Sequence, residues 1–166
     1  MRVTLIRHAE AGDDAPRDEA RALTARGRQD ARRMGRALAR RDVTFSVIVT
    51  SPLVRAVQTA EIVAAMVDYR ERIVVTDALV PEAAVSQAVG FLASMARDPE
   101  AVSSVALVAH EPILSALAAE LTGRPRHPPL KKAEALRIRM ESKPGGPPGA
   151  GTAKWRIDAR GRRERL

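Results

Sequence analysis

The sequence predicts an α/β fold: a three-layer α/β/α sandwich with a mostly parallel central sheet and an antiparallel C-terminal edge. Short apolar runs rich in β-branched residues alternate along the chain with longer stretches whose apolar residues repeat at helical spacing. With 166 residues, the chain is long enough for one domain with a substantial core. At the C-terminal end, residues 135–140 and 153–157 flank a Pro/Gly-rich stretch at 143–151, which predicts an antiparallel hairpin at the sheet edge.

In the first half of the chain, strands are expected at residues 3–6 and 45–49, each followed by a loop and a helix. The loop at 11–22 is charged, and its Asp13 and Asp14 are expected to face solvent and not a metal. Thr24 is expected to cap the first helix. Ser51 is expected to cap the second helix, with Pro52 as its first residue, so that Arg55 falls in the first turn.

In the second half, strands are expected at 73–76 and 104–109, with helices at 85–95 and 112–121. The last nine residues, 158–166, read as a frayed basic tail. The sequence therefore predicts one domain at 1–157 and a tail at 158–166.

The net charge of +8 is distributed unevenly. Residues 1–123 hold 15 Lys or Arg against 16 Asp or Glu, whereas residues 124–166 hold 13 against 4. The simplest reading of this basic quarter is a solvated face. Four aromatic residues (Phe45, Tyr69, Phe91 and Trp155) are too few for a base-stacking surface, so nucleic acid is not expected as a partner.

Composition also bears on location and cofactors. The chain has no cysteine, which excludes disulfides, thiolate metal sites and a cysteine nucleophile. No apolar run approaches the roughly 20 residues of a membrane span. We therefore expect a cytoplasmic protein without a membrane partner, and with no metal or other cofactor.

Polar side chains follow the ends of four expected strands. Arg7 and His8 follow the first strand, Arg55 the second, Glu82 lies in the loop after the third, and His110 follows the fourth. In an α/β sheet the carboxyl ends of the strands form the ligand crevice, so these residues are expected to converge. Two arginines and two histidines suit a phosphoryl group, whose charge lies on its oxygens. The third histidine, His127, lies in an irregular loop and is expected to be uninvolved.

Four segments, in order, resemble the motifs of one family. LIRHAE at 5–10 resembles the RHG signature of the histidine phosphatase, or phosphoglycerate mutase-like, superfamily. LTARGRQDA at 23–31, TSPLVRAVQTAE at 50–61 and VAHEP at 108–112 are similar to that family's later motifs. The short chain and the short loop after His8 look most like the SixA-type phosphohistidine phosphatases.

The resemblance implies a metal-independent phosphatase of phosphoglycerate mutase-like fold, with His8 as the nucleophile that accepts the phosphoryl group. It implies that Arg7, Arg55 and His110 bind the phosphate oxygens, and that Glu82 is the general acid, with Glu10 as a fallback. The two arginines should lower the pKa of His8 and keep its imidazole neutral. The expected substrate is phosphohistidine on a protein.

One departure from the family pattern and two alternative functions stay open. Ala9 replaces the glycine of the RHG signature, which adds a methyl group beside the nucleophile. The same pocket could serve a phosphomonoesterase that accepts many small esters. It could also belong to a binding module that holds a phosphorylated ligand without turnover, with the basic tail recruiting an acidic partner. The sequence does not predict the oligomeric state.

Overall fold

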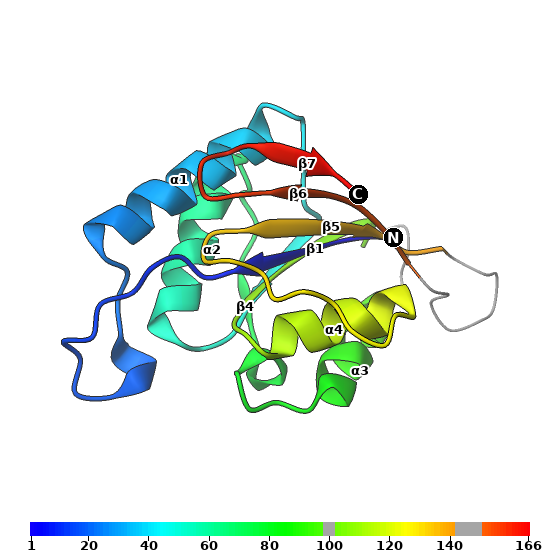
Figure 1. Ribbon diagram of the computed structural model, residues 1–166, viewed down its shortest axis with the longest axis horizontal. Coiled ribbons are helices and arrows are strands. Elements are labelled where there is room, and N and C mark those ends of the chain that lie inside the picture. The colour runs from blue at the N-terminus through cyan, green and yellow to red at the C-terminus, as the bar shows by residue number, and fades with distance from the viewer. Residues whose placement is uncertain (98–101, 142–150) are drawn as a thin grey trace.

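The computed structural model describes residues 1–97, 102–141 and 151–166, which form a single seven-stranded sheet with helices on both faces (Figure 1). The strands are β1 (Arg2–Arg7), β2 (Val47–Thr50), β3 (Val74–Val75), β4 (Ser104–Ala109), β5 (Ala135–Arg139), β6 (Thr152–Ile157) and β7 (Arg163–Arg165). The helices are α1 (Ala25–Ala39), α2 (Val54–Met66), α3 (Val85–Met95) and α4 (Ile113–Thr122), with short 3₁₀ helices at Asp18–Ala20 and Asp77–Leu79.

The sheet has a parallel half and an antiparallel half. Its strand order is β3-β2-β4-β1-β5-β6-β7. The pairs from β3 to β1 are parallel, and the pairs from β1 to β7 are antiparallel. The predicted α/β class, with its antiparallel C-terminal edge, is therefore confirmed.

The two faces of the sheet are covered by different helices, as Figure 1 shows. Leu5 and Leu107 face a core that includes Leu92 of α3 and Leu117 of α4. On the other face, Ile6, Ile48 and Val108 pack with the apolar sides of α1 and α2, including Met34, Leu38 and Val63. Because neighbouring residues of a strand point to opposite faces, a strand buried on both faces must be apolar throughout. This explains the continuous apolar runs of β1 and β4.

The start of α1 is fixed against the end of β1. The Thr24 side chain accepts a hydrogen bond from the Gly27 amide at 2.9 Å, which confirms Thr24 as the cap. A Cβ atom at Gly27 would lie 2.0 Å from the Glu10 carbonyl oxygen. Glycine is therefore required where the helix meets the loop that follows the strand.

The predicted start of α2 is wrong. The helix begins at Val54 after Leu53, which has no side-chain capping bond, so Ser51 is not its cap and Pro52 is not its first residue. The Ser51 hydroxyl contacts His110 instead. Arg55 is still the second residue of the helix, so it lies in the first turn as expected.

The prediction of a frayed C-terminus is also wrong, because residues 163–165 form β7 and pair with β6. The turn between these strands is ordered by Asp158, whose Oδ1 accepts the amides of Arg160 and Arg162 at 2.9 Å each. Gly161 adopts a φ of 76°, which glycine favours. All three residues of β7 are exposed and charged, so the strand lacks the apolar alternation by which strands are recognised.

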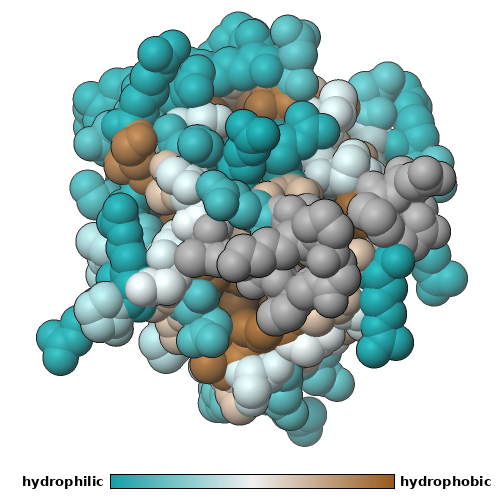
Figure 2. Space-filling model, turned by 90° about the vertical axis from the view of Figure 1, so that its right-hand side faces the viewer, coloured by the Kyte–Doolittle hydropathy of each residue, from teal (hydrophilic) through white to brown (hydrophobic). Residues whose placement is uncertain are grey.

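Most of the predicted Pro/Gly-rich stretch lies outside the described residues, but the hairpin it connects, β5 with β6, is confirmed. Figure 2 shows the side of the molecule that carries both chain ends, where hydrophilic residues surround smaller apolar areas. Across the described ranges, no helix has the length and apolar character needed to cross a bilayer. The cytoplasmic location and the domain boundary at residue 157 stay predictions.

Candidate active site

The two histidines of the predicted site follow neighbouring parallel strands at the same level. Arg7 ends β1 and pairs with Ala109, which ends β4. The His8 amide donates to the Ala109 carbonyl at 3.0 Å. The ring centroids of His8 and His110 are 4.9 Å apart, and both residues are buried. The strand register therefore brings together two residues that are 102 positions apart in the chain.

The His8 ring has a defined tautomer. Its Nδ1 atom lies 2.7 Å from the Ala9 carbonyl oxygen. Because a carbonyl oxygen only accepts, Nδ1 must carry the proton. In the neutral ring, Nε2 then holds a free electron pair, which is the form that a nucleophile requires.

Arg55 reaches the same edge of the sheet from the first turn of α2 and is 95% buried, with a relative exposure of 5%. Thr59, one helical turn later, donates to the Arg55 carbonyl at 2.7 Å and accepts the Ala9 amide at 3.1 Å. This hydroxyl joins α2 to the backbone beside His8. The position of Arg55 relative to His8 is therefore fixed by the main chain of both elements.

Arg7 and His110 each present a buried nitrogen toward which no described residue makes a hydrogen bond. These atoms are Arg7 Nε and His110 Nδ1. Arg7 Nη1 donates to the Leu130 carbonyl at 2.7 Å, which holds the guanidinium in place. A buried donor without a partner costs about 1–3 kcal/mol, so an acceptor that reached either atom would offset that cost.

Ser51 also belongs to the site, although the sequence analysis expected it only as a helix cap. Its Oγ atom lies 2.6 Å from His110 Nε2, and Ser51 is fully buried. When Ser51 donates this bond, the neutral ring of His110 carries its proton on Nδ1. The position of Ser51 at the end of β2, one residue before proline, was read as a helix cap, which is the commoner use of such a residue.

The environment keeps both histidines neutral. Burial, together with the charges of Arg55, Arg7 and Lys132, lowers the pKa of His8 to about 4, although the bond to Ala9 acts in the opposite direction. Burial and the neighbouring His8 and Arg55 lower the pKa of His110 to about 3. Both imidazoles are therefore uncharged at neutral pH.

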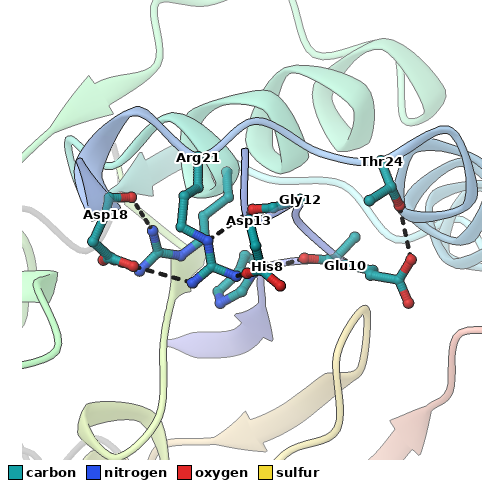
Figure 3. Close-up of polar contacts among 9 residues, drawn as sticks. His8, Glu10, Gly12, Asp13, Asp18, Arg21 and Thr24 are labelled. Carbon is teal, nitrogen blue, oxygen red and sulfur yellow. Dashed lines mark hydrogen bonds and ion pairs between the residues drawn. The ribbon is translucent and has the colours of Figure 1, made fainter. Parts of the chain in front are cut away.

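Asp18 is the second residue that the sequence analysis missed. Arg55 Nη2 contacts the Asp18 carboxylate at 2.8 Å, and Arg55 Nη1 donates to the Asp18 carbonyl at 2.8 Å. Arg21 also binds this carboxylate, together with Asp13 and the Gly12 carbonyl, as Figure 3 shows. Hydrogen bonds from Arg55 and Arg21 lower the pKa of Asp18. Nothing in a charged loop distinguishes this aspartate from its neighbours before the fold brings it to Arg55.

The two carboxylates that the sequence offered as general acid occupy different settings. Glu10 accepts a hydrogen bond from the Thr24 hydroxyl at 2.9 Å, and Figure 3 shows its carboxylate directed to Thr24. Glu82 is exposed in the turn before α3, and no contact joins its carboxylate to another described residue. The acid role of Glu82 stays a prediction, as does that of Glu10.

Ala9, the departure from the RHG signature, fits without strain. It is fully buried and packs with Leu23, Ala31 and Ala133. The extra methyl group therefore fills a small apolar cluster behind the histidine. His127 also lies outside the site: its Nδ1 is 2.9 Å from the Pro128 carbonyl, and its side chain neighbours Arg156.

No group of three or more potential metal ligands occurs within residues 1–97, 102–141 and 151–166. The expectation that the protein works without a metal stays a prediction. The site as described offers a neutral imidazole nitrogen beside two guanidinium groups and a second imidazole. This arrangement can bind a tetrahedral oxyanion and attack its central atom.

The fold and this constellation define the class of protein. The sequence profile of the Histidine phosphatase superfamily (branch 1) matches residues 3–81 of this chain. The structure is similar to a solved structure of the protein histidine phosphatase SixA complexed with tungstate, with a TM-score of 0.86 and 28% identity. The match covers 96% of this chain and 97% of the other.

Among proteins of known sequence, the chain is similar to phosphohistidine phosphatase SixA of Escherichia coli (strain K12). The two are 28% identical over 157 residues, which cover 95% of this chain and 93% of SixA. The fold is shared more widely, for example with the alpha-ribazole phosphatase from Shigella flexneri, at a TM-score of 0.70 and 20% identity. That match covers 93% of this chain and 95% of the other.

Proposed function

We propose that this protein is a phosphatase that removes the phosphoryl group from phosphohistidine on a protein, through a phosphorylated His8. The observation that carries the proposal is the fixed tautomer of His8, which leaves Nε2 free on a ring that lies beside the buried His110 and near the charge of the buried Arg55. The similarity to SixA along nearly the whole chain supports the substrate class.

In the first step, His8 Nε2 attacks phosphorus, and the bond from phosphorus to the leaving nitrogen breaks. The leaving imidazole of the substrate takes up a proton, so it departs as a neutral group. Arg7, Arg55 and His110 Nδ1 bind the oxygens, on which negative charge accumulates; the unpartnered nitrogens of Arg7 and His110 and the burial of Arg55 support this role. Water then attacks the phosphorylated His8, which releases inorganic phosphate and restores the free imidazole.

The low pKa of His8 suits this cycle. A protonated imidazole has no electron pair for attack, so the environment that lowers the pKa to about 4 keeps the nucleophile available at neutral pH. The depressed pKa also makes an imidazole a better leaving group in the second step.

The test is to trap the intermediate. The protein is mixed with a ³²P-phosphohistidine protein, quenched in alkali, which preserves phosphohistidine, and mapped by mass spectrometry. We expect label on His8 and its loss in His8→Asn, with turnover reduced by at least about 10³-fold. His127→Asn is the matched control, because His127 is a buried histidine outside the site.

Normal turnover by His8→Asn would refute the covalent route. The same preparation is assayed on aryl and sugar phosphates. A higher kcat/KM on these small esters than on the phosphohistidine protein would favour a phosphomonoesterase of broad specificity. Binding of phosphate with no turnover of any substrate would favour the non-catalytic phospholigand module.

A further inference from the structure

The excess positive charge of the C-terminal quarter lies beside the candidate active site. Six basic side chains gather at the end of the sheet where the carboxyl end of β1 and His8 lie. We call them the basic rim: Lys131, Lys132, Arg156, Arg160, Arg162 and Arg163. They come from two segments: the loop before β5, and the β6–β7 hairpin that the sequence analysis took for a tail.

Strand register places the hairpin at this end of the sheet. Ile6 of β1 pairs with Ala135 of β5, Ala135 pairs with Ile157 of β6, and Ile157 pairs with Arg163 of β7. The turn at 158–162 therefore leaves the sheet at the level where Arg7 and His8 leave β1. Since neighbouring strands are about 4.8 Å apart, the turn lies about 10–15 Å from His8 across the sheet.

Direct contacts connect the rim to the pocket. The loop before β5 contacts both Arg7 and His8. The Leu130 carbonyl accepts a hydrogen bond from Arg7 at 2.7 Å, and the Ala133 amide donates to the His8 carbonyl at 3.2 Å. Glu134 of the same loop pairs with Arg156 at 3.5 Å. A cavity of about 230 Å³ continues from there along the hairpin, lined by Glu134, Arg156, Asp158, Arg162, Arg163 and Glu164.

The charges of the rim are only partly compensated. Asp158 pairs with Arg162 at 2.7 Å, and Glu134 pairs with Arg156. Lys131 and Arg160 are exposed, and neither side chain forms an ion pair with a described residue. On the other side of the site, the loop at 11–22 that contacts Arg55 carries four acidic residues (Asp13, Asp14, Asp18 and Glu19) against Arg17 and Arg21, a balance of −2. The two sides of the site therefore have opposite signs.

We propose that the basic rim binds an acidic segment of the phosphorylated protein, next to the side chain whose phosphoryl group enters the pocket. The proposal rests on the proposed function and adds the partner's chemistry to it. A distance of about 10–15 Å corresponds to about three to five residues of extended chain. The acidic residues of the partner are therefore expected about three to five positions from the phosphohistidine, on one side of it.

The rim fits an acidic protein segment better than a nucleic acid. Single-stranded nucleic acid binding draws on exposed aromatic rings on which bases stack. The aromatic residue of the hairpin, Trp155, is buried, and Arg163 lies over its ring at 5.7 Å. What the rim offers a partner is charge without a stacking surface.

The test uses two synthetic phosphohistidine peptides of equal length, one with glutamates three to five positions from the phosphohistidine and one with glutamines there. At low salt we expect kcat/KM to be about tenfold higher for the acidic peptide, an advantage that disappears at about 0.5 M salt. Lys131→Glu/Arg160→Glu should abolish the preference and leave kcat/KM for p-nitrophenyl phosphate unchanged. Lys132 is kept, because its charge acts on His8.

The matched control is Arg72→Glu/Arg139→Glu, which makes the same charge change at exposed positions on the opposite edge of the sheet. Equal kcat/KM for the two wild-type peptides, or loss of the preference in the control, would overturn the proposal. A single-stranded oligonucleotide that inhibits more strongly than the dephosphorylated acidic peptide would assign the rim to nucleic acid instead. Turnover of p-nitrophenyl phosphate but of neither peptide would refute the substrate class of the proposed function.

Discussion

The parallel and antiparallel halves of the sheet meet at β1 and use their side chains in opposite ways. At the carboxyl ends of the parallel strands, polar groups are held by main-chain carbonyls, as the Ala9 carbonyl holds the buried His8 ring and the Asp18 carbonyl holds the buried Arg55 guanidinium. On the β6–β7 hairpin most polar groups are exposed and charged. Buried groups act strongly over short distances, whereas exposed charges act weakly and are screened by salt.

This difference ranks the effects of substitution. Changes in the parallel half should remove activity or folding stability by large factors. Changes in the antiparallel half should alter how a charged substrate binds and leave the chemical step intact.

The largest effect is expected from Arg55→Ala. It removes a buried cation from the place where negative charge accumulates, so kcat should fall by about 10²–10³-fold, as when an oxyanion donor is lost. Steady-state kinetics with p-nitrophenyl phosphate measure this, and circular dichroism checks that the variant folds. Arg41→Ala, two residues after the C-terminal end of α1, is the control. A change of less than threefold in kcat would show that Arg55 serves to hold Asp18 and not the phosphoryl group.

A large loss of folding stability is expected when the pH is lowered. The folded-state pKa values of His8 and His110, about 4 and about 3, lie below the ordinary 6.5, so the unfolded chain binds more protons in acid. This contribution to stability is complete above pH 6.5 and is lost as the pH falls below it. At about pH 5, each of the two imidazoles should lower the free energy of unfolding by about 2 kcal/mol relative to its value above pH 6.5.

Urea unfolding at about pH 7.5 and about pH 5 measures this loss. His8→Asn/His110→Asn should show a loss that is smaller by several kcal/mol, of the order given by the two pKa shifts. An undiminished loss in the double variant would place the titrating groups elsewhere in the molecule.

Ser51→Ala should have an intermediate effect. It leaves His110 Nε2 without its buried partner, which costs about 1–3 kcal/mol and frees the tautomer of the ring. We expect kcat to fall about tenfold with little change in KM, and Ser51→Thr to restore part of it. Ser94→Ala removes an exposed serine and should be neutral. If Ser51→Thr loses as much kcat and as much stability as Ser51→Ala, the hydroxyl does not orient His110 and Ser51 has a packing role alone.

Asp18→Asn should change binding more than chemistry. The carboxylate competes with an incoming anion for Arg55, but the side chain is 58% exposed, so its influence is screened. We expect the inhibition constant of inorganic phosphate to decrease about threefold. An increase would mean that Asp18 is needed to orient Arg55.

Removal of residues 158–166 should have the smallest effect on chemistry. It deletes β7 and the contact of Arg163 with Trp155, which should lower the free energy of unfolding by about 1–2 kcal/mol. The kcat/KM for p-nitrophenyl phosphate should change by less than about twofold, since β7 is three strands away from β1. A large loss of activity at a temperature where the shortened protein is folded would show that the hairpin shapes the pocket.

The sequence by itself determined the class of the fold, the order of the motifs and four of the residues that meet at the sheet edge: Arg7, His8, Arg55 and His110. It could do so because buried parallel strands are continuously apolar, and their ends are marked by the first polar residue. Ser51, Asp18 and the hairpin at 158–166 were decided by the tertiary structure alone. A serine before proline, an aspartate in a charged loop and a polar strand each suit several local structures. Only the partners that the fold brings to them, namely His110, Arg55 and β6, select one of these structures.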